Sequence, residues 1–101
     1  MVTREKVAGY LLSWTHPSGR SKADFFYRYG FRAEQWTALA RALIKHASSY
    51  DVAKVEETPF GMRYTIDGEL ETPDRRNPQV RVVWFVGHGE TAPRLVTAYP
   101  C

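Results

Sequence analysis

Apolar residues in the first half of the chain recur at the spacing of an α-helix. Trp36, Leu39 and Leu43 lie on one stripe, which is typical of a helix with one buried face. Nearer the N-terminus, Thr3 has the side chain of a helix N-cap, and Pro17 marks the end of the apolar pattern that follows it. The spacing predicts three helices, at about residues 4–14, 22–29 and 33–49.

Two local signals predict the ends of the middle helix. Ser21 followed by Asp24 resembles a capping box, in which both side chains satisfy backbone N–H groups of the first turn. Gly30 stands where a left-handed residue commonly ends a helix. We therefore expect Ser21 to cap this helix and Gly30 to terminate it.

After Tyr50 the apolar pattern changes to a period of two, which is typical of β-strands. Strands are predicted at about residues 52–58, 62–67, 79–87 and 94–99. Helices followed by strands favour an α+β fold. We expect one domain over residues 1–101, with N-terminal helices packed on one face of a roughly four-stranded antiparallel sheet.

Alternation along the strands assigns side chains to the two faces of this sheet. It places Tyr64, Ile66 and Trp84 toward the helices. In the last strand it places Val96 under the helices and Leu95 on the opposite face. The open face then has a cationic, hydroxyl-bearing character, although such residues are common on any half-exposed sheet face and the pattern alone favours that ordinary explanation. The polar set on the open face comprises Arg63, Arg81, Thr97 and Tyr99.

Charge and composition narrow the function only slightly. The net charge is +3 and the pI about 9.2, which supports an anionic partner weakly. Cys101 is the single cysteine, so no internal disulfide forms. The three histidines are scattered and have no metal-ligand spacing, so neither a metal nor a cofactor is expected. Without a signal segment or a membrane-length apolar run, a cytoplasmic setting is expected.

The turn after the first helix gathers groups that could carry chemistry. His16, Arg20 and Lys22 lie within seven residues, near the start of a short helix whose free N–H groups favour anions. Histidine is a common general acid or base in proteins, and His16 could act as either. The alternative is a solvated loop in which His16 and its neighbouring proline only end a helix.

The other two histidines have simpler explanations. His46 lies near the end of the longest helix, where a cation suits the helix dipole, and we assign it a structural role. His88 stands between two glycines in a predicted hairpin loop, where most histidines are only exposed. Its role stays open at this point.

Three segments, "HPSGRSKADFF", "ETPFGMRYTIDGEL" and "PRLVTAYP", resemble a bacterial family of small domains of unknown function. The resemblance covers the chain from about Leu11 to Pro100. The members of that family look like the barnase–EndoU–colicin–RelE-like nucleases of toxin–antitoxin modules and polymorphic toxins. This resemblance implies N-terminal helices, a four-stranded antiparallel sheet and RNA cleavage without a metal.

The resemblance also implies site residues. It covers His16, Arg20 and Lys22 in the loop and Thr97 and Tyr99 in the last strand, and Arg63 follows from strand alternation and the match at "GMRY". His16 would be the acid or base. The cations Arg20, Lys22 and Arg63 would hold phosphate, and Thr97 and Tyr99 would donate hydrogen bonds. Arg81, placed on the same face by strand alternation alone, would also bind phosphate.

These residues lead to the hypothesis of a metal-independent endoribonuclease toxin with no cofactor. The 2′-OH of the RNA would attack the phosphate and leave a 2′,3′-cyclic phosphate. Expected partners are an RNA substrate and a cognate antitoxin or immunity protein, with no membrane. Two alternatives stay open: a non-catalytic module of this fold that binds a protein partner, and an RNA-binding module that does not cleave.

Overall fold

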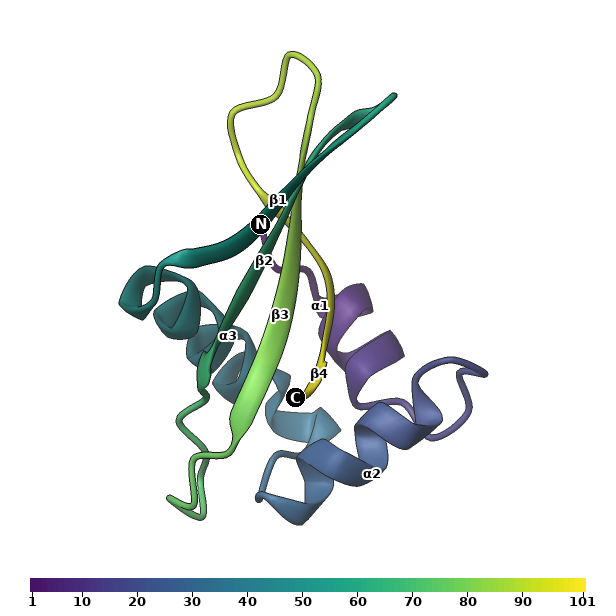
Figure 1. Ribbon diagram of the computed structural model, residues 1–101. Coiled ribbons are helices and arrows are strands. Elements are labelled where there is room, and N and C mark those ends of the chain that lie inside the picture. The colour runs from purple at the N-terminus through teal and green to yellow at the C-terminus, as the bar shows by residue number, and fades with distance from the viewer.

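The computed structural model describes the whole chain, residues 1–101, and has helices followed by an antiparallel sheet, as predicted (Figure 1). The helical part comprises α1 (Arg4–Lys6), the π-helical turn η1 (Val7–Leu11), α2 (Arg20–Arg28), the 3₁₀ turn η2 (Ala33–Gln35) and α3 (Trp36–Ser49). The strands are β1 (Val52–Thr58), β2 (Gly61–Glu69), β3 (Gln79–Gly87) and β4 (Arg94–Pro100). They lie in the order β1-β2-β3-β4.

The hydrophobic core lies between the helices and one face of the sheet. Val7 and Leu11 of η1 and Leu43 of α3 are fully buried and pack in one cluster with Trp84 of β3. The assignment of Trp84, and with it Tyr64 and Ile66 of β2, to the helix-facing side is confirmed. No helix is long and apolar enough to cross a membrane.

The first helix is confirmed at its start but is shorter and differently wound than predicted. The Thr3 hydroxyl caps it by accepting a hydrogen bond from the Lys6 amide at 3.2 Å. The chain then widens into a π-helical turn, with the Leu12 amide donating to the Val7 carbonyl at 2.8 Å. Such turns change the direction in which the following side chains point. The helical segment ends at Leu11 rather than at about residue 14.

The predicted capping box of α2 is wrong. The helix begins at Arg20, Gly19 is its N-cap residue, and no side chain bonds there. Asp24 instead makes an ion pair with Arg28 at 2.8 Å. A side chain at position 19 would collide with the Tyr10 carbonyl oxygen. The absence of a side chain on Gly19 therefore allows the loop to pack closely against η1. Gly30 is left-handed (φ +100°), as expected for the end of this helix.

His46 has a structural role, but for a different reason from the helix dipole. It is buried on the inner face of α3 rather than exposed near its end. Its Nε2 lies 3.2 Å from the Gly68 carbonyl oxygen and 3.0 Å from the Val80 carbonyl oxygen. Because carbonyl oxygens only accept, Nε2 carries the proton. The side chain thus ties α3 to the adjacent ends of β2 and β3.

The predicted alternation fails at one point in β4. Val83 of β3 pairs with Thr97, but Trp84 pairs with Leu95, which leaves Val96 as an extra residue in a β-bulge. Leu95 is therefore buried in the core, and Val96 lines the open face beside Thr97. The prediction that Val96 packs under the helices and Leu95 opposite them is wrong, because the bulge shifts the phase of the strand.

Candidate functional site

The open face of the sheet is hollowed across all four strands. The hollow has a volume of about 620 Å³, and polar side chains form much of its lining. Thr97 and Tyr99 enter from β4, next to Arg81 of β3, and Arg63 enters from β2. The expectation that these four side chains share the open face is confirmed. The hollow is further lined by Ala53, Lys54, Glu56, Thr65, Asp67, Val83 and Val96.

The charge of Arg81 is already matched within the protein. Its guanidinium donates two hydrogen bonds to Asp67 across the paired strands β2 and β3, from Nε to Oδ1 at 2.8 Å and from Nη2 to Oδ2 at 3.0 Å. This forked hydrogen bond lowers the pKa of Asp67, against a smaller opposing effect of desolvation. The same bond, together with contact to Tyr99, raises the pKa of Arg81. Arg81 is therefore held in place, and the carboxylate of Asp67 neutralises its charge.

Arg63 differs from Arg81 because it makes no ion pair. Its cross-strand neighbour Glu56 lies nearest to Lys54, at 3.7 Å. The Arg63 side chain is exposed. Arg63 is therefore the cation in the hollow that is most available to a bound anion.

A second hollow, of about 610 Å³, lies between the N-terminal helical segment, the following loop and β4. His16 and Tyr10 line it together with Lys6. Thr97 and Val96 line both hollows, so the two spaces meet at the bulge of β4. The loop that carries His16 thus borders the face that carries the other predicted site residues.

Tyr10 is the residue at the centre of this second hollow. Its hydroxyl and the Thr97 hydroxyl share a hydrogen bond of 3.0 Å. Its ring packs edge-on against the His16 ring, with centroids 5.0 Å apart. The ammonium groups of Lys6 and Lys22 lie 5.2 and 5.5 Å from the centroid of the same ring. Tyr10 therefore connects the loop, the N-terminal helix and β4.

Sequence reasoning missed Tyr10. Its spacing from Val7 and Leu11 fits the apolar stripe of a regular helix, where it would be an ordinary core residue. The π-helical turn is what brings its hydroxyl to β4. Such turns leave no recognisable pattern in a single sequence.

The orientation of His16 is set by its own loop. Its Nδ1 accepts a hydrogen bond from the Ser18 amide at 3.0 Å. The neutral ring therefore carries its proton on Nε2, which is free to donate to a ligand. Proton transfer through this ring requires the Ser18 amide to turn away, since a protonated ring has no acceptor.

The other predicted residues differ in how close they lie to the two hollows. Lys22 donates to the Ser18 carbonyl at 3.1 Å and so joins the Tyr10 cluster. Arg20 is exposed at the first residue of α2 and lines neither hollow. His88 joins the tips of the two hairpins, with its Nε2 lying 3.2 Å from the Pro59 carbonyl oxygen, and it lines neither hollow. No three His, Cys, Asp or Glu side chains come together as a group that could hold a metal ion.

A comparison with models of protein families identifies the family to which this chain belongs. The profile of DUF6883, a domain of unknown function, matches residues 1–101. The chain belongs to the DUF6883 family. The predicted membership of a family of small domains of unknown function is thereby confirmed, whereas the relation to the nuclease superfamily stays a prediction. A search of curated proteins found no match.

A solved structure shares the fold of this DUF6883 domain. It is a chain of a contact-dependent growth inhibition toxin–immunity protein complex from Klebsiella pneumoniae 342. The alignment covers 99% of this chain and 98% of that chain, with a TM-score of 0.76 and 16% sequence identity. At this identity the likeness shows the fold alone.

Proposed function

We propose that this DUF6883 domain is the toxin of a toxin–antitoxin or polymorphic toxin system and that it cleaves RNA without a metal ion. The observation that carries the proposal is the meeting of two hollows at Thr97. One hollow supplies a histidine with a free Nε2, and the other supplies an unpaired arginine, Arg63. The likeness to a chain of a toxin–immunity complex supports the same class of system.

The proposed reaction is transesterification within the RNA. The 2′-oxygen attacks phosphorus and loses its proton, and the 5′-oxygen leaves and gains one, which yields a 2′,3′-cyclic phosphate and a 5′-hydroxyl. Arg63 and Lys22 stabilise the charge that develops on the phosphate oxygens. Tyr99 and Thr97 donate hydrogen bonds, and Tyr99 stacks on a base. Arg20 and Arg81 contact phosphates further along the strand.

His16 is the proposed acid or base. In the free protein the Ser18 amide occupies its Nδ1, so the ring first presents Nε2–H to a phosphate oxygen. RNA binding then turns the Ser18 amide away and frees the ring for proton transfer. A positioned acid or base contributes about 10²- to 10⁴-fold in rate.

The experiment is inducible expression in a bacterium, scored for growth and RNA integrity. Wild type is expected to stop growth and fragment RNA, and His16→Ala is expected to do neither while keeping its melting temperature. His88→Ala is the matched control, because His88 lies away from both hollows, and it should remain toxic. Purified protein should cleave RNA in the presence of EDTA. If wild type and His16→Ala fragment RNA equally, His16 is not the acid or base of the reaction.

A second candidate is a non-catalytic module that binds the toxin of such a system. The matched complex contains both a toxin and an immunity protein, and the fold likeness is compatible with either role. An immunity protein would leave growth unaffected when expressed alone and would protect cells from a cognate toxin. Expression of the wild-type chain alone therefore separates the two candidates.

A further inference from the structure

The outer edge of β1 has no strand beside it. β1 is the first strand of the sheet order, and every residue from Val52 to Val55 is exposed. At the other edge, by contrast, the Leu95 amide of β4 donates to the Met1 carbonyl at 3.1 Å. The β1 edge thus offers free backbone N–H and C=O groups to another strand.

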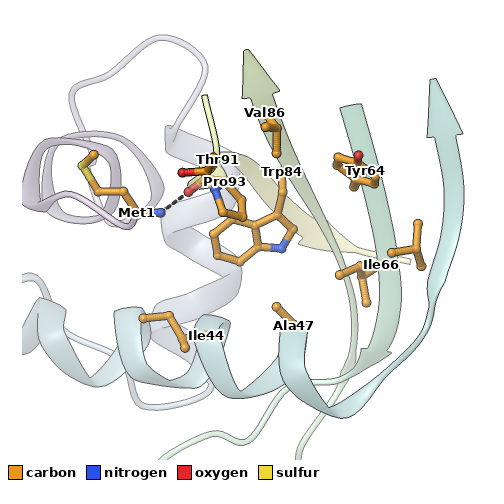
Figure 2. A pocket seen from close by; sticks show the side chains of 10 residues that line it. Met1, Ile44, Ala47, Tyr64, Ile66, Trp84, Val86, Thr91 and Pro93 are labelled. Carbon is orange, nitrogen blue, oxygen red and sulfur yellow. Dashed lines mark hydrogen bonds between the residues drawn. The ribbon is translucent and has the colours of Figure 1, made fainter. Parts of the chain in front are cut away.

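The apolar side of β1 is also uncovered. On the helix-facing side of the sheet, Val52 and Val55 are 45% and 52% exposed. Val52 borders an apolar groove of about 650 Å³ between α3 and the sheet, and Ile44 of α3, 55% exposed, lines the same groove (Figure 2). The Trp84 indole also lines this groove, and its buried nitrogen has no hydrogen-bond partner. The core therefore ends in an apolar border along β1.

The charges of β1 are self-complementary in one register. Lys54 and Glu56 point to the open face, and Val55 between them points to the helix-facing side. If two copies of β1 pair antiparallel with Val55 opposite Val55, each Lys54 lies opposite Glu56 of the other copy. A shift of one residue would place the apolar side of one copy on the open face of the other. A shift of two residues in either direction places Lys54 opposite Lys54 or Glu56 opposite Glu56. Opposite charges favour a cross-strand pair and like charges oppose it, so the register is specified.

We propose that β1 pairs with β1 of a second copy of this chain, centred on Val55, to give one eight-stranded sheet across a two-fold axis. Val55 then packs against its symmetry mate, and the two apolar borders face each other. On the open face, charges alternate across three strands, from Arg63 through Glu56 to Lys54 of the second copy. The pairing is isologous and closed, so it stops at a dimer.

Charge reversal tests the register. Lys54→Glu places glutamate opposite Glu56, and Glu56→Lys places lysine opposite Lys54, so each variant replaces two attractive pairs with two repulsive ones. Each should weaken the dimer by about tenfold or more in Kd. The double variant Lys54→Glu/Glu56→Lys should dimerise as wild type does. Arg41→Glu on the exposed side of α3 is the control for Lys54→Glu, since its charge change is the same.

Mixing the two single variants is the decisive measurement. In a mixed pair the two glutamates of the Lys54→Glu copy face the two lysines of the Glu56→Lys copy. A heterodimer should therefore form at concentrations where each variant alone is monomeric, and sedimentation velocity over a range of concentrations measures this. A wild-type chain that stays monomeric at millimolar concentration overturns the proposal, even if another protein's strand occupies the edge. The proposal is also overturned if the single variants dimerise as tightly as wild type. It is likewise overturned if the two single variants form no heterodimer when they are mixed.

Discussion

The hydroxyl groups of Tyr10 and Thr97, 87 residues apart in the chain, share a hydrogen bond of 3.0 Å at the point where the two hollows of the candidate site meet. Tyr10 comes from a π-helical turn and Thr97 from the residue after a β-bulge. Two local irregularities of the backbone therefore create the contact. π-Turns and bulges are both frequent at functional sites.

Tyr10→Phe removes this hydrogen bond and keeps the ring that packs on His16. The loss of one part-buried hydrogen bond costs about 0.5–1.5 kcal/mol of the free energy of unfolding. RNA cleavage should fall by more than this small loss of stability explains, because the Thr97 hydroxyl loses the hydrogen bond that holds it beside the His16 loop. Tyr50→Phe, at an exposed ring away from both hollows, is the control. If both variants have the same activity, Tyr10 only stabilises the fold.

Arg63 and Arg81 should differ in their contribution to RNA binding. An unpaired cation that contacts a phosphate contributes about −0.7 to the slope of log affinity against log salt on a single strand. Arg63→Gln should lower the magnitude of that slope by about this amount. Arg81→Gln should lower it less, since Asp67 already balances the Arg81 charge. Fluorescence anisotropy with a labelled RNA over a salt series measures both slopes, and equal slopes would show that Arg81 exchanges Asp67 for phosphate.

The Asp67–Arg81 pair predicts a dependence of stability on pH. The folded-state pKa of Asp67 is lowered, mainly by the hydrogen bonds from Arg81, so the pair stabilises the protein above the unfolded pKa of about 3.9. This stabilisation is lost as the pH falls through the folded pKa. Both side chains are partly exposed, so solvent screening keeps this contribution small.

Chemical denaturation at several pH values checks this prediction. Asp67→Asn should be less stable than wild type near pH 7 and should approach it at pH values well below 4. In parallel, NMR titration should find a higher pKa for the Asp67 carboxyl in Arg81→Gln than in wild type. An unchanged pKa would contradict the assignment of its cause.

His46→Leu should destabilise the fold by about 1–3 kcal/mol, because the buried carbonyl oxygens of Gly68 and Val80 lose the donor that α3 supplies. His88→Leu, at an exposed loop position, is the matched control and should change stability little. Thermal unfolding followed by circular dichroism measures both. A stable His46→Leu variant would mean that water replaces the imidazole.

Regular elements of this fold could be predicted from the sequence because burial imposes a period. The bounds of β1 and β3 agree with the predicted strands, and α3 follows its apolar stripe. The two irregularities were not predictable, since one extra residue at Val96 or in the turn Val7–Leu11 changes no composition and breaks the period only locally. They decide the orientation of Leu95 and Tyr10.

The candidate site was predictable to the same extent. Strand alternation placed Arg63, Arg81 and Tyr99 on one face, because these residues lie in regular parts of their strands. It could not show that Asp67 neutralises Arg81, because that pairing depends on the register between β2 and β3. The burial of His46 also depends on tertiary packing, as its place in the helix suited an exposed cation equally well.

The bulge at Val96 gives β4 one residue more than regular pairing with β3 needs. Leu95 on one side of it belongs to the core, and Thr97 and Tyr99 on the other side belong to the open face. Deletion of Val96 alone would place Leu95 directly before Thr97, in a regular alternation that keeps Leu95 in the core and both hydroxyl groups on the open face. What such a deletion removes is the local bend of the strand and the side chain that lines both hollows. The fold should therefore tolerate the loss of this one residue, whereas the shape of the candidate site should not.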